Sequence, residues 1–337
     1  MARLAGVSTA TVSRALNMPG KVSVSLRTRI GMAVATLRYK PNIAARMLAA
    51  QRSWTVAAIV PTIQNNVFAR GLEAIQARLE AAGFTLLIGA TGYDAERERH
   101  LTEAFITRGV DGLIYMGASH LPATYTALER HRLPFVNQGV FDPDGPYPCV
   151  GFDNREAAQL AVHHLLDLGH RRIGMVAGIA SGNDRAAGRI AGVRETLVTG
   201  GDPGWQPPIV EEPYTIAGGR SGLGALLALP RPPSAIVCGN DILGYGVLFE
   251  ARDRGLRVGP ELSVIGFDDL EFSEQIGLST IHIPTAEMGR LAAEYVLARL
   301  AGETPPHATR IEIRLASRAS TAPPAQPAAN ADTRRIA

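Results

Sequence analysis

Arginine, asparagine and aspartate residues recur where predicted strands end in the second half of the chain. Asn183, Arg185 and Arg189 lie in the run GNDRAAGRIAG, Asn240 ends CGN, and Asp268 ends VIGFD. An arginine donates paired hydrogen bonds to hydroxyl or carboxylate oxygens, and a carboxylate accepts hydrogen bonds from hydroxyl groups. This set suits the binding of a small polyol. Each strand-end Asn or Asp could instead serve only as the N-cap of the following helix.

Catalytic and cofactor chemistry has no comparable support in the sequence. No G-x-G-x-x-G run follows the first predicted strand and no P-loop lysine is present, so the sequence contains no recognisable phosphate-binding loop for a nucleotide. His163 and His164 lie on a predicted helix and His170 precedes a predicted strand, and we interpret all three as structural. Cys149 and Cys238 form neither a metal-ligand cluster nor a disulfide framework, which fits a reducing cytoplasm. We expect no enzymatic activity, no cofactor and no metal.

Short apolar runs alternate with helical stretches from Trp54 onward, and this alternation predicts parallel sheets covered by helices. The predicted strands are 55–61, 84–90, 111–117, 134–139, 149–153, 172–178, 209–214, 235–240 and 262–267. The predicted helices include Phe68–Ala82, Ala95–Arg108, Arg155–Leu168 and Asp184–Val198. About 260 residues suffice for two such lobes, with a ligand between them at the carboxyl ends of the strands.

Charge divides the chain into a basic head and an acidic body. Residues 1–52 contain nine of the 34 Lys and Arg residues and none of the 31 Asp and Glu residues, of which the first is Glu73. The head therefore carries +9 and the remainder −6, although the net charge of the chain is only +3. A basic segment before an acidic body is typical of a protein that binds a polyanion. A solubilising charged tail is the alternative, and the apolar periodicity of the head argues against it.

The head has the pattern of a helix–turn–helix. Gly6-Val7 marks a turn, and the Ser8 hydroxyl can cap a second helix whose inward positions are Val12 and Leu16. The outward positions are Thr9, Ala10, Ser13, Arg14 and Asn17. A third helix is predicted at about 24–37, capped by Ser23, with an inner face of Leu26, Ile30, Val34 and Leu37. A short polar recognition helix of this kind enters the major groove of DNA.

A break at Pro41 precedes a second short helical run, Ile43–Ala50. Two turns of helix are unstable alone, so this segment would form only against a partner, such as the twin subunit on DNA. Leu48 projects from it with little core to cover it. An apolar side chain in that place can wedge between base steps in a minor groove, or it can simply pack on the head.

The runs GVSTATVSRALN and PNIAARML, together with the arrangement of the rest of the chain, resemble the lactose-repressor (LacI) family. The resemblance implies an all-α helix–turn–helix head joined to an α/β two-lobed, periplasmic-binding-protein-like (type I) effector domain. It assigns base reading to Thr9, Ala10 and Arg14, with Arg14 suited to guanine. It assigns phosphate contacts to Ser8, Thr11, Ser13 and Asn17. It assigns minor-groove contacts of the hinge to Asn42, Ala45 and Leu48.

The same resemblance implies an effector pocket formed by Phe68, Asn183, Arg185, Arg189, Tyr214, Asn240 and Asp268. The stretches NVFARGLEAIQ, Ser119-His120, VGFDN, NDRAAGR and GNDILGYGVLFEA are similar to the gluconate-utilisation repressors of the family. Two cations in one loop, Arg185 and Arg189, fit a carboxylate-bearing sugar acid, unless Arg185 pairs with Asp184 or Glu195 on the surface. The expected partners are a near-palindromic double-stranded DNA operator, a sugar or sugar-acid effector and a second copy of the chain.

The expected organisation is a DNA-binding head at 1–40, a hinge helix at 41–52, a ligand-binding and dimerisation domain at 53–316, and a disordered tail at 317–337. The tail has no Leu and several Pro, so it cannot form the leucine-heptad helix through which the family's tetramers assemble, and we expect a dimer. The first residues contain no long apolar run, so we expect no signal peptide, and no stretch reaches the roughly 20 apolar residues of a membrane span. These features predict a cytoplasmic regulator rather than a periplasmic binding protein.

The first helix of the head is short, because only Met1–Ala5 precede the turn at Gly6. In the family this helix begins earlier, so we expect the natural start to lie roughly six to ten residues upstream, giving a helix long enough to pack. The alternative is a short form, a sugar-binding protein of the same two-lobed fold that does not bind DNA.

Overall fold

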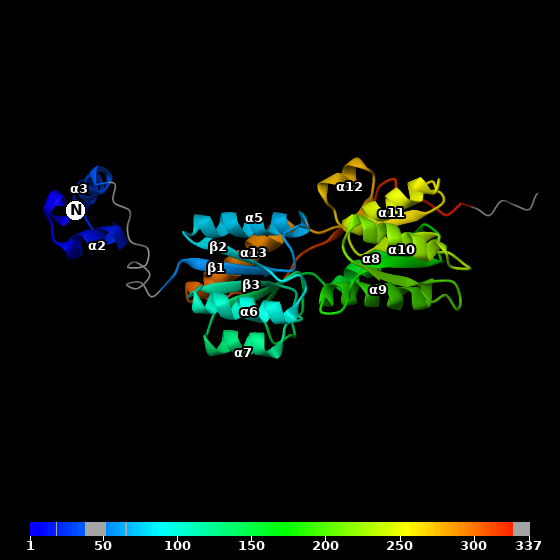
Figure 1. Ribbon diagram of the computed structural model, residues 1–337, viewed down its shortest axis with the longest axis horizontal. Helices are drawn as coiled ribbons and strands as arrows, with labels where there is room; N and C mark the ends of the chain where they lie inside the picture. The colour runs from blue at the N-terminus through cyan, green and yellow to red at the C-terminus, as the bar shows by residue number, and fades with distance from the viewer. Residues whose placement is uncertain (18, 38–51, 65, 326–337) are drawn as a thin grey trace, which may run out of the picture. The chain divides into compact units, whose positions relative to one another are not determined.

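A computed structural model describes residues 1–17, 19–37, 52–64 and 66–325 (Figure 1). The chain separates into two compact units, Met1–Trp54 and Thr55–Ala337. Among the described residues no helix is long and apolar enough to cross a membrane.

The first unit is a small helical domain. Its helices are α1 (Ala2–Ala5), α2 (Thr9–Asn17) and α3 (Val24–Thr36), with the 3₁₀ turn η1 (Pro19–Lys21). Its buried residues are Ala5, Val12, Ala15, Ile30 and Ala33, with Leu26 and Val34 packed at the margin. Leu37 was expected on the inner face but is 49% exposed, because α3 ends at Thr36 and the core ends with it.

Local hydrogen bonds explain the turn between α1 and α2. Gly6 adopts the left-handed conformation, with φ of 60°, which glycine reaches without steric cost. The Ser8 hydroxyl oxygen accepts the Thr11 N–H at 3.1 Å, so the predicted cap of α2 is confirmed. Ser23 precedes α3 but makes no side-chain cap.

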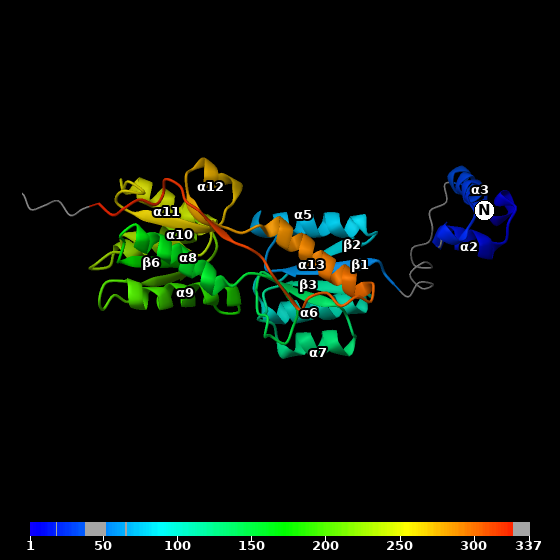
Figure 2. The ribbon, with the colours of Figure 1, turned by 180° about the vertical axis from the view of Figure 1, so that it is seen from behind.

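The second unit contains two six-stranded sheets within residues 55–325. The first sheet is parallel throughout, in the order β11-β5-β4-β3-β1-β2. Its strands are β1 (Thr55–Val60), β2 (Thr85–Ala90), β3 (Gly112–Met116), β4 (Phe135–Gln138), β5 (Cys149–Gly151) and β11 (Ala308–Arg310). Helices α5 (Asn66–Ala81) and α13 (Thr285–Leu300) cover one face, and α6 (Ala95–Thr107) and α7 (Pro122–Arg130) cover the other (Figures 1 and 2). These elements form the first lobe.

The second sheet has the order β12-β10-β9-β8-β6-β7, and only its edge strand β12 runs antiparallel. Its strands are β6 (Ile173–Gly178), β7 (Ile209–Glu212), β8 (Ala235–Cys238), β9 (Ser263–Asp268), β10 (Ser279–His282) and β12 (Arg314–Ala316). Its helices are α8 (Asn154–Asp167), α9 (Asp184–Gly200), α10 (Ile216–Leu227), α11 (Asp241–Asp253) and α12 (Glu271–Gln275). These elements form the second lobe.

The chain passes between the lobes three times, at 151–154, 282–285 and 310–314. Every strand predicted from an apolar run is present, within one or two residues at most ends. Strands β10, β11 and β12 were not predicted: β10 precedes the second crossing, β11 follows that crossing, and β12 follows the third. The two-lobed α/β architecture expected from the alternation of runs is therefore confirmed.

The predicted disordered tail is wrong for residues 317–325. Arg318 donates to Asp269 at 2.7 Å and to the Leu278 carbonyl at 2.8 Å. The Ser320 hydroxyl donates to the Val264 carbonyl, and the Ala322 carbonyl lies 2.9 Å from a ring nitrogen of His170. These polar contacts fasten the segment along the second lobe, although its composition is poor in large apolar residues. The remaining tail, 326–337, lies outside the described residues.

Candidate ligand cavity and nucleic-acid interface

A cavity lies between the two lobes, and all seven residues of the predicted effector pocket line it: Phe68, Asn183, Arg185, Arg189, Tyr214, Asn240 and Asp268. It holds about 700 Å³ of empty space, including its opening to solvent. The polar members follow strands of the second lobe or begin its helices, so the parallel topology brings them to one edge of the sheet.

Arg189 lies deep in this cavity on α9 and is 7% exposed. Its Nε donates to Asn154 Oδ1 at 3.1 Å, its Nη1 donates to the Gly239 carbonyl, and its guanidinium stacks 4.4 Å from the centre of the Phe267 ring. Among the described residues no carboxylate lies within 4.0 Å of it as an ion-pair partner. Arg189 is therefore a buried cation whose charge is held by neutral groups.

Asp268 ends β9 in a conformation that side chains rarely adopt, with φ of 104°, and Asp269 follows at 54°. Such backbone strain persists only where neighbours hold it. Asp241 supplies one restraint, because its carboxylate accepts the Leu270 N–H at 2.8 Å. Burial raises the pKa of the Asp268 carboxyl to about 8, with Asp241 adding to the rise and Arg189 opposing it. At neutral pH this carboxyl is mainly protonated and can donate as well as accept.

Asn183 and Asn240 both cap helices, as the simpler interpretation of strand-end residues predicted. Asn240 Oδ1 accepts the Leu243 N–H at 2.9 Å at the start of α11, and Asn183 Oδ1 accepts the Ala186 N–H at 3.4 Å at the start of α9. Both nevertheless line the cavity. Capping uses the amide oxygen, so the Asn240 amide nitrogen stays available to a ligand.

Arg185 was expected either to face the ligand or to pair with Asp184 or Glu195, and it both lines the cavity and pairs with Asp184. Its Nη1 pairs with Asp184 Oδ1 at 2.9 Å, and its side chain also lines the cavity. Glu195, the other proposed partner, pairs instead with Arg155 at 3.4 Å. The positive charge of Arg185 is therefore partly compensated, unlike that of Arg189.

Several lining residues were missed from the sequence, chiefly Tyr93, Met116, Gln138, Phe152 and Thr285. Gln138 and Met116 end the first-lobe strands β4 and β3, so the strand-end rule applied to that lobe would have found them. Tyr93 lies in the turn after β2 with φ of 66°, and burial raises its pKa. Its ring centre lies 6.3 Å from that of Tyr214 on the opposite lobe. Nothing in its local sequence marks it.

The outward side of α2 is polar and free of acidic residues, and Arg14 is its basic residue. Thr9, Ala10, Ser13 and Arg14 are exposed, Ser8 at the cap is exposed, and Thr11 is half-buried. The backbone of Asn17 belongs to α2, and its side chain lies outside the described part of the chain. The predicted hinge residues Asn42, Ala45 and Leu48 lie outside it as well.

A helix–turn–helix head with a polar outward helix, followed by two lobes around a cavity that holds two arginines and an aspartate, defines a ligand-responsive DNA-binding regulator. Residues 1–42 match the family described as "Bacterial regulatory proteins, lacI family", and residues 162–321 match "Periplasmic binding protein-like domain". The chain belongs to the LacI family of transcriptional regulators.

Similar proteins span nearly the whole chain. The HTH-type transcriptional repressor CytR of Escherichia coli (strain K12) is 34% identical over 305 residues, 89% of this chain and 88% of CytR. The HTH-type transcriptional regulator GntR of Pseudomonas aeruginosa is 35% identical over 308 residues, 90% of this chain and 89% of GntR. The crystal structure of the Lac repressor dimer, bound to operator and the anti-inducer ONPF, is 26% identical with a TM-score of 0.83, covering 95% of this chain and 97% of that one.

Proposed function

We propose that this regulator is a repressor of a carbohydrate or sugar-acid utilisation operon, and that its effector is gluconate or a related sugar acid. The observation that carries the proposal is Arg189, a buried guanidinium in the cavity with no ion-pair partner among the described residues. A buried cation is costly unless it is paired, and a ligand carboxylate would pair with it through two parallel hydrogen bonds.

The charges around Arg189 favour an anion over a neutral sugar. The raised pKa of Asp268, about 8, leaves that carboxyl mainly neutral at pH 7, so it adds little negative charge to the cavity. Arg185 contributes a second, partly compensated cation. In this arrangement the ligand carboxylate binds Arg189, and hydroxyl groups bind Asp268 and the amide of Asn240 on the neighbouring wall.

The DNA-binding half of the proposal assigns base reading to Thr9, Ala10 and Arg14. Phosphate contacts fall to Ser8, Thr11, Ser13 and Asn17, and hinge contacts in the minor groove to Asn42, Ala45 and Leu48. The exposure of Thr9, Ala10 and Arg14 supports the first assignment. The protein binds as a homodimer to a near-palindromic operator, with the head at 1–40, the hinge at 41–52 and the ligand-binding and dimerisation domain from 53.

Calorimetric titration of the full chain tests the ligand, with gluconate as the probe and glucose as a neutral compound of similar size. The proposal predicts heat of binding with gluconate and much weaker binding of glucose. Clear binding of neutral sugars, with no heat from any sugar acid, would overturn the assignment of the effector. A gel-shift assay with operator DNA selected from a random pool tests the second half, and a chain that binds ligand but selects no DNA would be a sugar-binding protein alone.

A further inference from the structure

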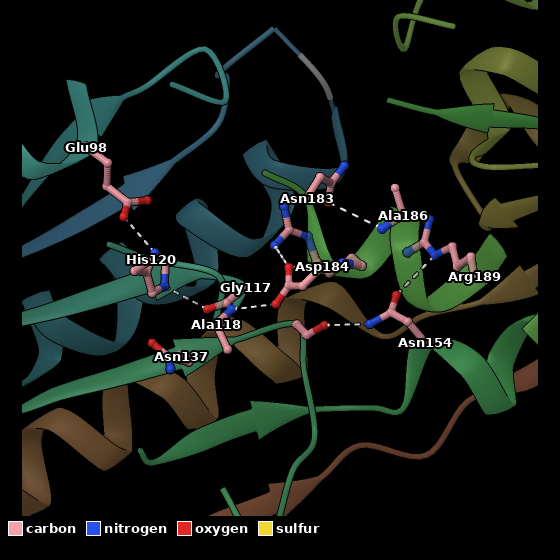
Figure 3. Close-up of polar contacts among 12 residues, drawn as sticks. Glu98, Gly117, Ala118, His120, Asn137, Asn154, Asn183, Asp184, Ala186 and Arg189 are labelled. Carbon is pink, nitrogen blue, oxygen red and sulfur yellow. Dashed lines mark hydrogen bonds and ion pairs between the residues drawn. The ribbon is translucent and has the colours of Figure 1, made fainter. Parts of the chain in front are cut away.

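A series of hydrogen bonds joins the two lobes beside the cavity (Figure 3). Glu98 on α6 lies 2.6 Å from His120 Nδ1, and His120 Nε2 lies 3.0 Å from the Gly117 carbonyl oxygen. In the same loop, the Ala118 N–H donates to Asp184 Oδ2 at 2.6 Å. Asp184 is the first residue of α9 in the second lobe. The series therefore runs from the first lobe across the lobe boundary.

The first part of this series is a buried contact between a histidine ring and a carboxyl group. The His120 side chain is 2% exposed and that of Glu98 is 13% exposed. The His120 ring packs 4.9 Å from the Tyr115 ring and 5.5 Å from the Tyr125 ring, measured between centres. Each ring nitrogen lies within hydrogen-bond distance of an oxygen, Nδ1 of the Glu98 carboxyl and Nε2 of the Gly117 carbonyl, so the ring is held on both sides. Because the pair is buried and packed, it fixes the 117–120 loop in one place.

The second part holds a ligand-facing side chain. Asp184 uses one carboxylate oxygen for Ala118 and the other for Arg185 Nη1, at 2.9 Å. Arg185 rests against Gly117, where a Cβ atom would lie 1.9 Å from Arg185 Nη1. Gly117 also has φ of +89°. A side chain at 117 would therefore both strain the loop and displace the guanidinium from the cavity wall.

We propose that Glu98, His120 and Asp184 are positioning residues of the cavity: they latch the 117–120 loop of the first lobe to α9 of the second and so orient Arg185. In the sequence, the Ser119-His120 pair served only as one of the stretches similar to the gluconate-utilisation repressors. The structure gives His120 of this pair a physical role, because its ring connects Glu98 to the 117–120 loop. The latch itself needs no ligand, and only its effect on affinity rests on the proposed function. A ligand entering the cavity meets Arg185 already oriented, so less of its binding free energy is lost to ordering that side chain.

The rate of hydrogen exchange at the Ala118 amide, measured in the unliganded full chain, reports directly whether the hydrogen bond to Asp184 is formed. Ala118 is exposed, and the hydrogen bond that holds its N–H comes from the opposite lobe. Loss of Asp184 in the Asp184→Ala variant should accelerate exchange by roughly tenfold or more, because a charge-assisted hydrogen bond is lost. Asp184→Asn retains an acceptor and should keep most of the protection.

Two controls separate the latch from general destabilisation. Asp253→Ala breaks another aspartate–arginine pair of the second lobe, Arg220–Asp253 at 2.6 Å, which has no contact with the 117–120 loop, and it should leave Ala118 exchange unchanged. His120→Gln cannot bridge Glu98 and Gly117 as the two nitrogens of the rigid ring do, and it should accelerate Ala118 exchange with Asp184 intact. The His120→Gln variant also provides the test of the latch if the Asp184→Ala protein does not fold.

Unchanged Ala118 exchange in folded Asp184→Ala and His120→Gln proteins would overturn the latch. Equal acceleration in Asp253→Ala would overturn it too, because the effect would then be a general loosening. Gluconate titration of the same variants should show roughly tenfold weaker binding for Asp184→Ala, the change expected when one charged contact is no longer pre-oriented. If exchange responds as expected but the wild-type chain binds no sugar acid, the latch holds and the proposed effector fails.

Discussion

Arg189→Ala removes the only cavity cation that lacks a carboxylate partner in the described part of the chain. If a ligand carboxylate supplies that partner, the variant loses a bidentate charge-assisted contact worth roughly 2–3 kcal/mol. That free energy corresponds to a loss of affinity of roughly 30- to 150-fold. Because Arg189 is 7% exposed, solvent does little to screen this contact.

The substitution also alters the unliganded protein. Asn154 Oδ1 and the Gly239 carbonyl lose their donor, and each buried acceptor left unpaired costs roughly 1–3 kcal/mol. Removal of a buried charge offsets part of this cost, and water entering the cavity can replace the donor. We therefore expect a folded variant with a modestly lower melting temperature and a much larger defect in binding.

Calorimetric titration with gluconate measures the effect, and two matched arginine variants calibrate it. Arg185→Ala removes a cation already paired with Asp184, so its loss should be smaller, about tenfold. Arg155→Ala removes an exposed arginine paired with Glu195 and should change nothing. Gluconate affinity of Arg189→Ala within about threefold of wild type would refute the role given to Arg189, as would a greater loss in Arg185→Ala.

Three further predictions concern pH, the hinge and assembly. The pKa of Asp268 is raised to about 8, so its contribution to stability is complete at acid pH and is lost as pH rises toward 8. Asp268→Asn should flatten the fall in melting temperature of the unliganded protein between about pH 5 and pH 8, and an unchanged slope would contradict the raised pKa. Leu48→Ala should weaken operator binding in a gel shift while gluconate affinity stays equal, and unchanged operator affinity would refute the wedge. Light scattering at micromolar concentration should give a dimer, and a tetramer would refute the expectation drawn from the leucine-free segment 317–337.

The sequence was informative wherever a pattern was local. Apolar runs such as 55–61 and 172–178 predicted β1 and β6, because a buried parallel strand must be apolar along its whole length. Strands β11 and β12 have three residues each, too few to form a recognisable run. Their places are set by pairing with strands distant in the chain.

In the candidate site too, residues with a local sequence pattern were predicted, and contacts between residues distant in the chain were not. Strand-end residues such as Asn240 and Asp268 were found because parallel strands bring their carboxyl ends to one edge. The sequence could not show whether such a residue caps a helix or lines the cavity, and Asn240 does both. The contact of Ala118 with Asp184 joins residues 66 positions apart, and that of His170 with Ala322 joins residues 152 apart. No local pattern encodes such pairs, so neither the latch nor the ordered segment 317–325 was predicted.

Operator affinity measured with and without ligand tests the central claim most directly. Fluorescence anisotropy of labelled, pool-selected operator DNA gives the affinity of the full chain in the presence and absence of saturating gluconate. The account predicts an affinity that changes at least roughly tenfold on adding gluconate to the wild-type protein, a coupling of about 1.4 kcal/mol, and no change in Arg189→Ala. An operator affinity that is the same with and without gluconate, in a wild-type protein that calorimetry shows to bind it, would contradict the account.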